Sequence, residues 1–122
     1  MSRQQYAVLN EITLSRQALL SNYRYYSHRN PQAQIAPVLK SNAYGHGLWD
    51  FSLIADEAGM DWFGVDSIVE GLTLRKNGIK KPILVLGYTL PERFEDAAKN
   101  NISLTISSRD SIKALSTWKL NS

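Results

Sequence analysis

One lysine in this sequence occupies a position where an amine could do chemistry. Lys40 ends the apolar run at 35–39, Ile-Ala-Pro-Val-Leu, which is typical of a β-strand. Because strand side chains alternate between faces, Lys40 shares one face with Ala36 and Val38. Burial on such a face disfavours the ammonium form, and a neutral amine can attack an aldehyde to form a Schiff base. The alternative is that Lys40 extends its ammonium group into solvent.

The residues after Lys40 make this position more specific. Positions 38–47 read Val-Leu-Lys-Ser-Asn-Ala-Tyr-Gly-His-Gly. This run resembles the cofactor-lysine signature of the alanine racemases, a fold-type III family that depends on pyridoxal phosphate. The segments 10–14, 70–75 and 82–87 are similar to further parts of the same family. The resemblance therefore extends over nearly the whole chain.

The resemblance implies roles for four residues. Lys40 matches the lysine that binds pyridoxal 5′-phosphate as a Schiff base and acts as one of two catalytic bases. Tyr44 matches the tyrosine whose hydroxyl contacts the cofactor phosphate. Val38 and Leu86 match apolar positions that line the cofactor, although plain barrel core explains these two residues equally well. No metal site is implied.

The resemblance also implies an activity. Members of the family interconvert L-alanine and D-alanine by a two-base mechanism, in the cytoplasm and as homodimers, and D-alanine serves cell-wall synthesis. We expect residues 1–122 to be the N-terminal portion of the cofactor-binding barrel domain, without the second barrel half and the β-rich domain. We expect this fragment to be inactive alone and to self-associate through its open sheet edges.

Two other functions remain open at this stage. The chain could be a pyridoxal-phosphate carrier or homeostasis protein without catalysis, or an inactive half-barrel interaction module. The preference for alanine over serine or another amino acid is also open, as is a biosynthetic or catabolic role.

The elements that must position Lys40 follow from the apolar pattern. Runs at 35–40, 62–66, 82–87 and 102–106 predict strands, and helical patterns separate them. This alternation predicts an α/β fold with about four βα units and parallel strands, the first half of a TIM-type (β/α)8 barrel. Because a complete barrel takes about 250 residues, 122 residues are too few for one.

Local signals place the boundaries of several elements. A helix is predicted from Ser15 to about His28, and Gly59 suits the end of the helix before the second strand. Ser67 and Glu70 have the spacing of a capping box. Pro37 cannot donate a hydrogen bond to a sheet, so we expect one gap or a bulge beside it.

The two ends of the chain carry weaker signals. Residues 8–12 predict a short strand before the first helix. Ser108 or Asp110 is expected to cap the last helix, whose apolar residues include Ile112 and Leu115.

Other polar residues near these loops favour structural roles. His46 is interpreted as a loop histidine that orders the turn rather than as a general base. Gly45 and Gly47 are expected to give the backbone freedom after the first strand. Asp66 follows the second strand, where helix capping or solvent exposure is favoured over a role in the site.

Composition excludes several classes of protein. Hydrophobic residues make up 43% and charged residues 20%, which is typical of a globular protein. The absence of cysteine excludes a disulfide scaffold and a cysteine-bound metal. The sequence shows no membrane span. The net charge of +3 is spread out, and its densest part, at 75–81, is interpreted as a solvated face rather than a nucleic-acid site.

Overall fold

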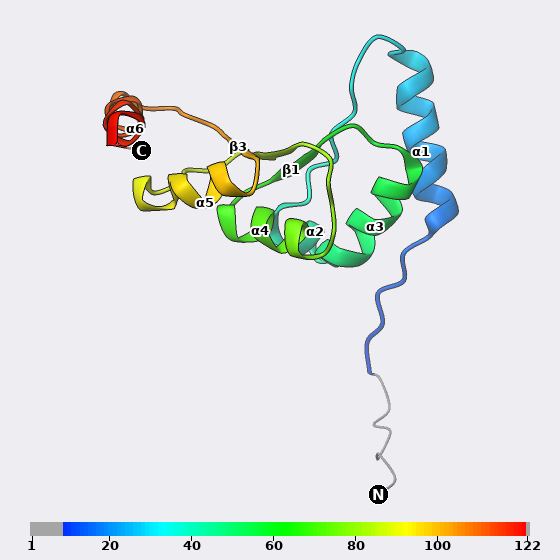
Figure 1. The fold of residues 1–122 in the computed structure, drawn as a ribbon. Coiled ribbons are helices and arrows are strands. Elements are labelled where there is room, and N and C mark those ends of the chain that lie inside the picture. The colour runs from blue at the N-terminus through cyan, green and yellow to red at the C-terminus, as the bar shows by residue number, and fades with distance from the viewer. Residues whose placement is uncertain (1–8, 122) are drawn as a thin grey trace, which may run out of the picture.

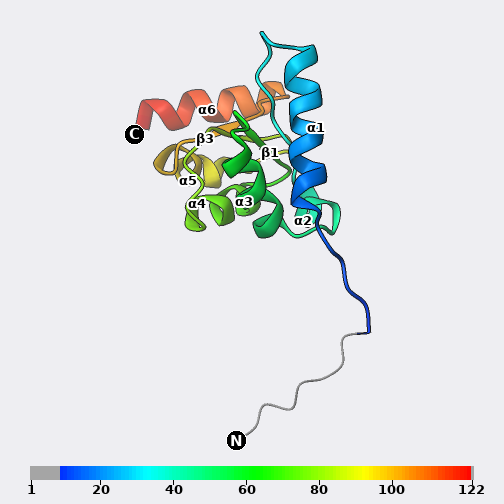
Figure 2. The same cartoon turned by 90° about the vertical axis from the view of Figure 1, so that its right-hand side faces the viewer.

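The computed structural model describes residues 9–121, and they form a parallel sheet with helices packed on one face (Figures 1 and 2). The helices are α1 (Arg16–Arg29), α2 (Lys40–Tyr44), α3 (Leu48–Ala58), α4 (Ile68–Lys76), the short 3-10 helix η1 (Pro91–Arg93), α5 (Phe94–Lys99) and α6 (Arg109–Asn121). The strands are β1 (Phe63–Val65), β2 (Ile83–Val85) and β3 (Ile102–Leu104). No helix within the described part of the chain is both long enough and apolar enough to cross a bilayer.

The three strands lie in the order β1-β2-β3 and are all parallel, as the apolar runs predict. In the middle row of the register, Gly64 pairs with Leu84 and Leu84 with Ser103. A fourth extended segment, residues 35–39, runs parallel to β1 on its other side. One bridge, between Val38 and Gly64, joins this segment to the sheet.

Pro37 explains why the predicted strand at 35–40 is reduced to one bridge. Gly64 N–H donates to Pro37 O at 2.9 Å, and Leu39 N–H donates to Gly64 O at 2.7 Å. The preceding bond of this ladder would need an N–H at Pro37 to reach the carbonyl of Trp62, and proline has none. The expected gap is confirmed. The strand also ends before Lys40, because Leu39 leaves the extended region with φ −113° and ψ 17°.

The sheet has one buried and one open face. Phe63, Val65, Ile83 and Val85 are fully buried on the face covered by the helices. Side chains one position along a strand point the other way. Accordingly, Val38 is 41% exposed while its neighbour Leu39 is 1% exposed. The alternation predicted for the first apolar run is therefore confirmed.

Most of the local helix signals are confirmed. Ser15 caps α1, and Ser67 and Glu70 form the complete capping box of α4. Gly59 ends α3 with φ 90°. Ser108, rather than Asp110, lies at the start of α6, where its Oγ accepts from the N–H of Ser111 at 3.1 Å.

Two predictions at the ends of the chain differ from the structure. Residues 9–12 of the predicted strand at 8–12 form no strand, and Val8 lies outside the described residues. Ile112 and Leu115 lie on α6 but are 55% and 37% exposed, so this apolar side of the helix is not covered.

Candidate functional site

The chain turns left-handed immediately after Lys40. Ser41, Asn42, Ala43 and Tyr44 all have φ between 53° and 55°, so α2 is a short left-handed turn built without glycine. This conformation costs about 1–2 kcal/mol per non-glycine residue. Backbone strain of this kind persists where the surrounding structure enforces it, and it is concentrated at functional sites.

Hydrogen bonds and burial hold the left-handed turn in place. Asn42 Oδ1 accepts from the N–H of Leu48 at 2.8 Å, and Asn42 O accepts from the N–H of Gly47 at 3.0 Å. Ala43 is 2% exposed, and its N–H donates to Leu39 O at 2.8 Å. The turn is therefore held by Leu39, at the buried end of the 35–39 segment, and by Leu48, at the start of α3. As expected, Gly47 has a positive φ, of 94°.

Lys40 and Tyr44 lie at the two ends of this turn. Lys40 is half-buried at the carboxyl end of the 35–39 segment, and no described residue pairs with its ammonium group. Tyr44 is 61% exposed. In α/β barrels this end of the strands carries the catalytic groups. The turn thus presents one amine and one phenol at the functional end of the sheet.

Val38 and Leu86 form an apolar floor beside the turn. A Cβ atom at Gly64 would lie 3.5 Å from Val38 Cγ2 and 3.5 Å from Leu86 Cδ1, so the two side chains flank the glycine on the open face. Leu86 is 42% exposed. A flat aromatic ring could lie against such a floor, which makes these two residues suitable for lining a cofactor as well as for filling a barrel.

Asp66 follows β1 at the same end of the sheet. Its N–H donates to Glu70 Oε2 at 2.9 Å, and its carbonyl accepts from the N–H of Gly87 at 3.0 Å. A Cβ atom at Gly87 would lie 2.4 Å from that carbonyl oxygen, so only glycine fits there. The Asp66 side chain is exposed, in agreement with the structural role preferred for it.

His46 lines a different region. Its ring centroid lies 6.5 Å from that of Phe51, and both residues line a groove of about 430 Å³ between α1, α3 and the 35–39 segment. Lys40 does not line this groove. The structure therefore gives no support to His46 as a base acting beside Lys40.

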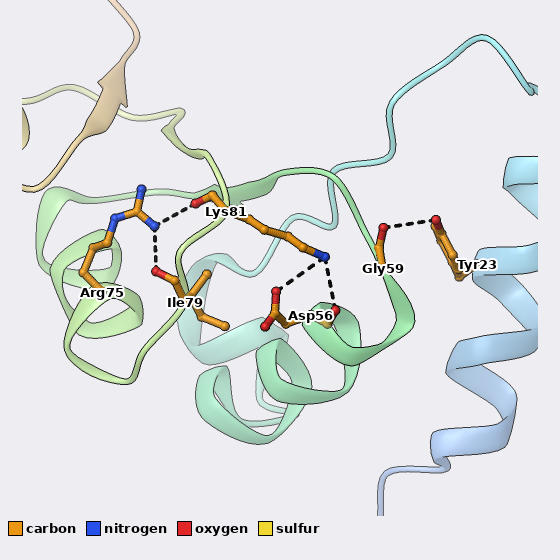
Figure 3. Close-up of polar contacts among 6 residues, drawn as sticks. All are labelled: Tyr23, Asp56, Gly59, Arg75, Ile79 and Lys81. Carbon is orange, nitrogen blue, oxygen red and sulfur yellow. Dashed lines mark hydrogen bonds and ion pairs between the residues drawn. The ribbon is translucent and has the colours of Figure 1, made fainter.

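The opposite end of the sheet holds a guanidinium clamp that the sequence analysis missed. Arg75 Nε donates to Asn100 O at 2.8 Å and Nη2 to Asn101 O at 2.8 Å. Its Nη1 donates to Ile79 O and Lys81 O, each at 2.7 Å (Figure 3). Burial lowers the pKa of Arg75 from its usual value because it removes water from the guanidinium. Arg75 is thus not part of a solvated face, and the interpretation of residues 75–81 was wrong at this position.

Lys81 and Tyr23 extend these contacts to α3. Lys81 Nζ donates to Asp56 O at 3.1 Å and lies 3.5 Å from Asp56 Oδ1 (Figure 3). Tyr23 Oη donates to Gly59 O at 3.2 Å, which ties α1 to the end of α3. These contacts fix the segments that lead into the strands, and they lie away from Lys40.

Parallel strands, each followed by a helix, with a lysine at the carboxyl end of the first extended segment, define the first half of a TIM-type α/β barrel. The model of the family "Alanine racemase, N-terminal domain" matches residues 14–121, and the chain belongs to this family.

Two racemases are similar to much of this chain. The serine/alanine racemase of Enterococcus gallinarum is 38% identical over 107 residues, which cover 87% of this chain and 15% of that protein. The alanine racemase of Latilactobacillus sakei is 51% identical over 74 residues, 61% of this chain and 20% of that protein. The chain thus spans less than a third of the length of these relatives.

Solved structures agree with the fold. The alanine racemase of Oenococcus oeni superposes with a TM-score of 0.76 at 36% identity, over 82% of this chain and 29% of that one. A histidine racemase of Leuconostoc mesenteroides gives a TM-score of 0.78 at 40% identity, over 83% of this chain and 27% of that one. Each match covers more than four fifths of this chain.

Proposed function

We propose that this chain provides the cofactor-lysine part of a pyridoxal-phosphate-dependent alanine racemase. One observation carries the proposal: Lys40 stands directly before a strained, glycine-free left-handed turn at the open carboxyl end of a parallel sheet. The membership of the chain in the alanine racemase family supports alanine as the substrate.

The residues around Lys40 fit pyridoxal 5′-phosphate. The cofactor, when bound, supplies an electron sink for negative charge at the substrate Cα. Lys40 Nζ would attach it covalently and then carry a proton to or from one face of that carbon. Tyr44, at the far end of the turn, would donate its hydroxyl to the phosphate. Val38 and Leu86 would support the ring from the open face of the sheet.

We also propose the remaining features that the family suggests. The whole enzyme acts as a homodimer in the cytoplasm and supplies D-alanine for the cell wall. Racemisation needs a second base on the other face of Cα. Tyr44 is assigned to the phosphate in this proposal and no other described residue is assigned as a base, so we expect the 122-residue chain alone to bind the cofactor without racemising alanine.

Cofactor attachment can be tested on the chain as it exists. We expect pyridoxal phosphate to produce an absorbance band near the visible edge. Borohydride reduction should then leave one pyridoxyl phosphate group on Lys40 in peptide mass spectra. Lys40→Arg should abolish both signals, and the control Lys80→Arg, at an exposed lysine before β2, should keep them. Equal labelling of Lys40 and surface lysines would contradict the proposal.

Exchange at the substrate carbon separates the racemase from a cofactor carrier. The loaded chain is mixed in separate samples with L-alanine and with D-alanine in D₂O, and the Cα proton is followed by NMR. Because one base serves one face of Cα, slow exchange of one enantiomer with retained configuration, lost in Lys40→Arg, would show one working base. Binding without any exchange would favour a carrier.

A further inference from the structure

We propose that Asn77 is a site of spontaneous chemical modification, where the side-chain amide is converted to a carboxylate, and that the hydrogen bonds of Arg75 control the rate. The loop concerned, residues 77–81, joins the end of α4 to the start of β2. It lies at the end of the sheet opposite Lys40, and the inference does not depend on the chemistry at that lysine.

The sequence singles out Asn77, because no other asparagine of the chain is followed by glycine. The backbone nitrogen of a following residue can attack the asparagine Cγ, and glycine hinders this attack least because it has no Cβ. The new N–Cγ bond closes a succinimide ring, and the side-chain nitrogen leaves as ammonia with the proton of the attacking nitrogen. Water then opens the ring at either carbonyl, which gives aspartate or isoaspartate without any other reactant.

The structure leaves the reacting groups of this pair accessible. Gly78 is exposed and Asn77 is half-buried. A Cβ atom at Gly78 would have no heavy atom within 4 Å, so the space beside this residue is open. None of the described residues forms a hydrogen bond with the Asn77 side-chain amide. No contact therefore has to break at the side chain before it reacts.

The backbone of the folded loop, in contrast, opposes the reaction. Gly78 N–H donates to Arg75 O at 3.0 Å. The attacking nitrogen must give up this proton, and a hydrogen bond to the protonated form makes that harder. Ring closure also needs a rotation of ψ at Asn77 away from its value of 4° at the end of α4. The reaction therefore requires local opening of the loop.

The Arg75 side chain keeps this loop closed. Its Nη1 donates to Ile79 O and Lys81 O, which both belong to the loop (Figure 3). Ile79 is also 3% exposed, and its N–H donates to Leu74 O at 3.1 Å. Local opening of a segment generally costs less free energy than global unfolding. Loss of the guanidinium should therefore make opening of this loop more frequent.

Modification of Asn77 should in turn weaken the contacts of Arg75. Isoaspartate adds a methylene carbon to the main chain between α4, which carries Arg75, and the loop carbonyls that Arg75 binds. The new carboxylate also lies at the C-terminus of α4, where negative charge is unfavourable. The modified chain should unfold at a lower urea concentration than the unmodified chain.

Peptide mass spectrometry of the chain after incubation at mildly alkaline pH tests the site. We expect the mass change from amide to carboxylate at Asn77, and two products of equal mass that separate on chromatography. Asn101 is the internal control, because Arg75 also binds its carbonyl and it is exposed, but isoleucine follows it. Asn101 should be modified at least about tenfold less, since a β-branched residue hinders attack. Equal modification of the two asparagines would overturn the assignment.

Substitution of Arg75 tests its control of the rate. Arg75→Met should accelerate modification of Asn77 about tenfold or more, because the loop opens more often. Leu39→Ala, which removes a buried side chain from the 35–39 segment, is the control for a general loss of stability. Equal acceleration by the two variants would show that Asn77 reacts from the unfolded chain and would overturn the role of Arg75.

A milder variant covers the case in which Arg75→Met does not fold. Arg75→Lys keeps a positive charge but lacks the planar group that reaches both loop carbonyls. It should accelerate modification of Asn77 while circular dichroism shows a folded chain. An unchanged rate in the folded Arg75→Lys variant would overturn the role of Arg75.

Discussion

Arg75 lies where the chain enters β2 and β3, and each nitrogen of its guanidinium group donates to a backbone carbonyl. At the ends where it leaves the 35–39 segment and β2, Val38 and Leu86 are more than 40% exposed. The Lys40 ammonium there pairs with no described residue, and the backbone is strained. The same sheet is thus closed at one end and open at the other.

The two ends of the strands therefore differ in role, one contributing mainly to stability and the other to function. In α/β barrels the amino-terminal end contributes mainly stability, and the carboxyl-terminal end carries the reactive groups. Hydrogen bonds at the entry end fix the strands in register, so the exit end can tolerate exposed apolar side chains and a costly turn. Substitutions at the two ends should therefore have very different effects on unfolding.

Removal of the Arg75 clamp should have the largest effect. Arg75→Met leaves four carbonyls without their donor, and a hydrogen bond to a charged group contributes a net of about 1.5–3 kcal/mol to stability. Three of the four bonds are only part-buried and one is exposed, so water can bind these carbonyls in the variant and reduce the loss. We expect a loss of roughly 3 kcal/mol in the free energy of urea unfolding. The neighbouring Lys76→Met, at an exposed position, should change it by less than about 0.5 kcal/mol. Similar values for both variants would show that the clamp is not a stabilising feature.

Leu39 and Val38 are adjacent in the 35–39 segment but point to opposite faces of the sheet, and we expect their substitution to affect stability differently. Leu39→Ala removes a side chain that is 1% exposed and should cost about 2–4 kcal/mol. Val38→Ala, on the open face, should cost less than about 1 kcal/mol. The same denaturation assay measures both. A cost at Val38 as large as that at Leu39 would contradict the placement of the two side chains on opposite faces of the sheet.

Relief of strain in the turn should have the smallest effect and the opposite sign. Ser41 is exposed with φ 53°, so Ser41→Gly should stabilise the chain by about 0.5–1 kcal/mol. Ser21→Gly, in the middle of α1, should instead destabilise it by about 0.5–1 kcal/mol. Thermal unfolding of the two variants tests this. Destabilisation by Ser41→Gly would show that the turn is not strained.

Predictions from sequence succeeded where the signal is local. The capping box of Ser67 and Glu70 and the chain reversal at Gly59 depend on residues a few positions apart, and both form as expected. The alternation of Val38 and Leu39 between faces is also local, as is the gap at Pro37.

The missed features depend on distant contacts or on unusual backbone angles. Arg75 reaches Asn100, which is 25 positions away, and nothing near Arg75 in the sequence indicates that partner. Ser41 and Ala43 give no sign of a positive φ, because residues of these types rarely adopt one. Only the family resemblance drew attention to this turn, and it did so through Lys40 and Tyr44 rather than through the backbone.

The left-handed turn also limits which amino acids can stand beside the lysine. A β-branched side chain at positions 41–43 would add steric strain to a backbone that is already unfavourable for any L-residue. Valine, isoleucine and threonine are therefore poor choices at these three positions, whatever their effect on chemistry. A library that randomises residues 41–43 should return glycine, asparagine, aspartate and small residues. The backbone conformation would thus restrict the amino acids found at positions 41–43 even without selection for catalysis.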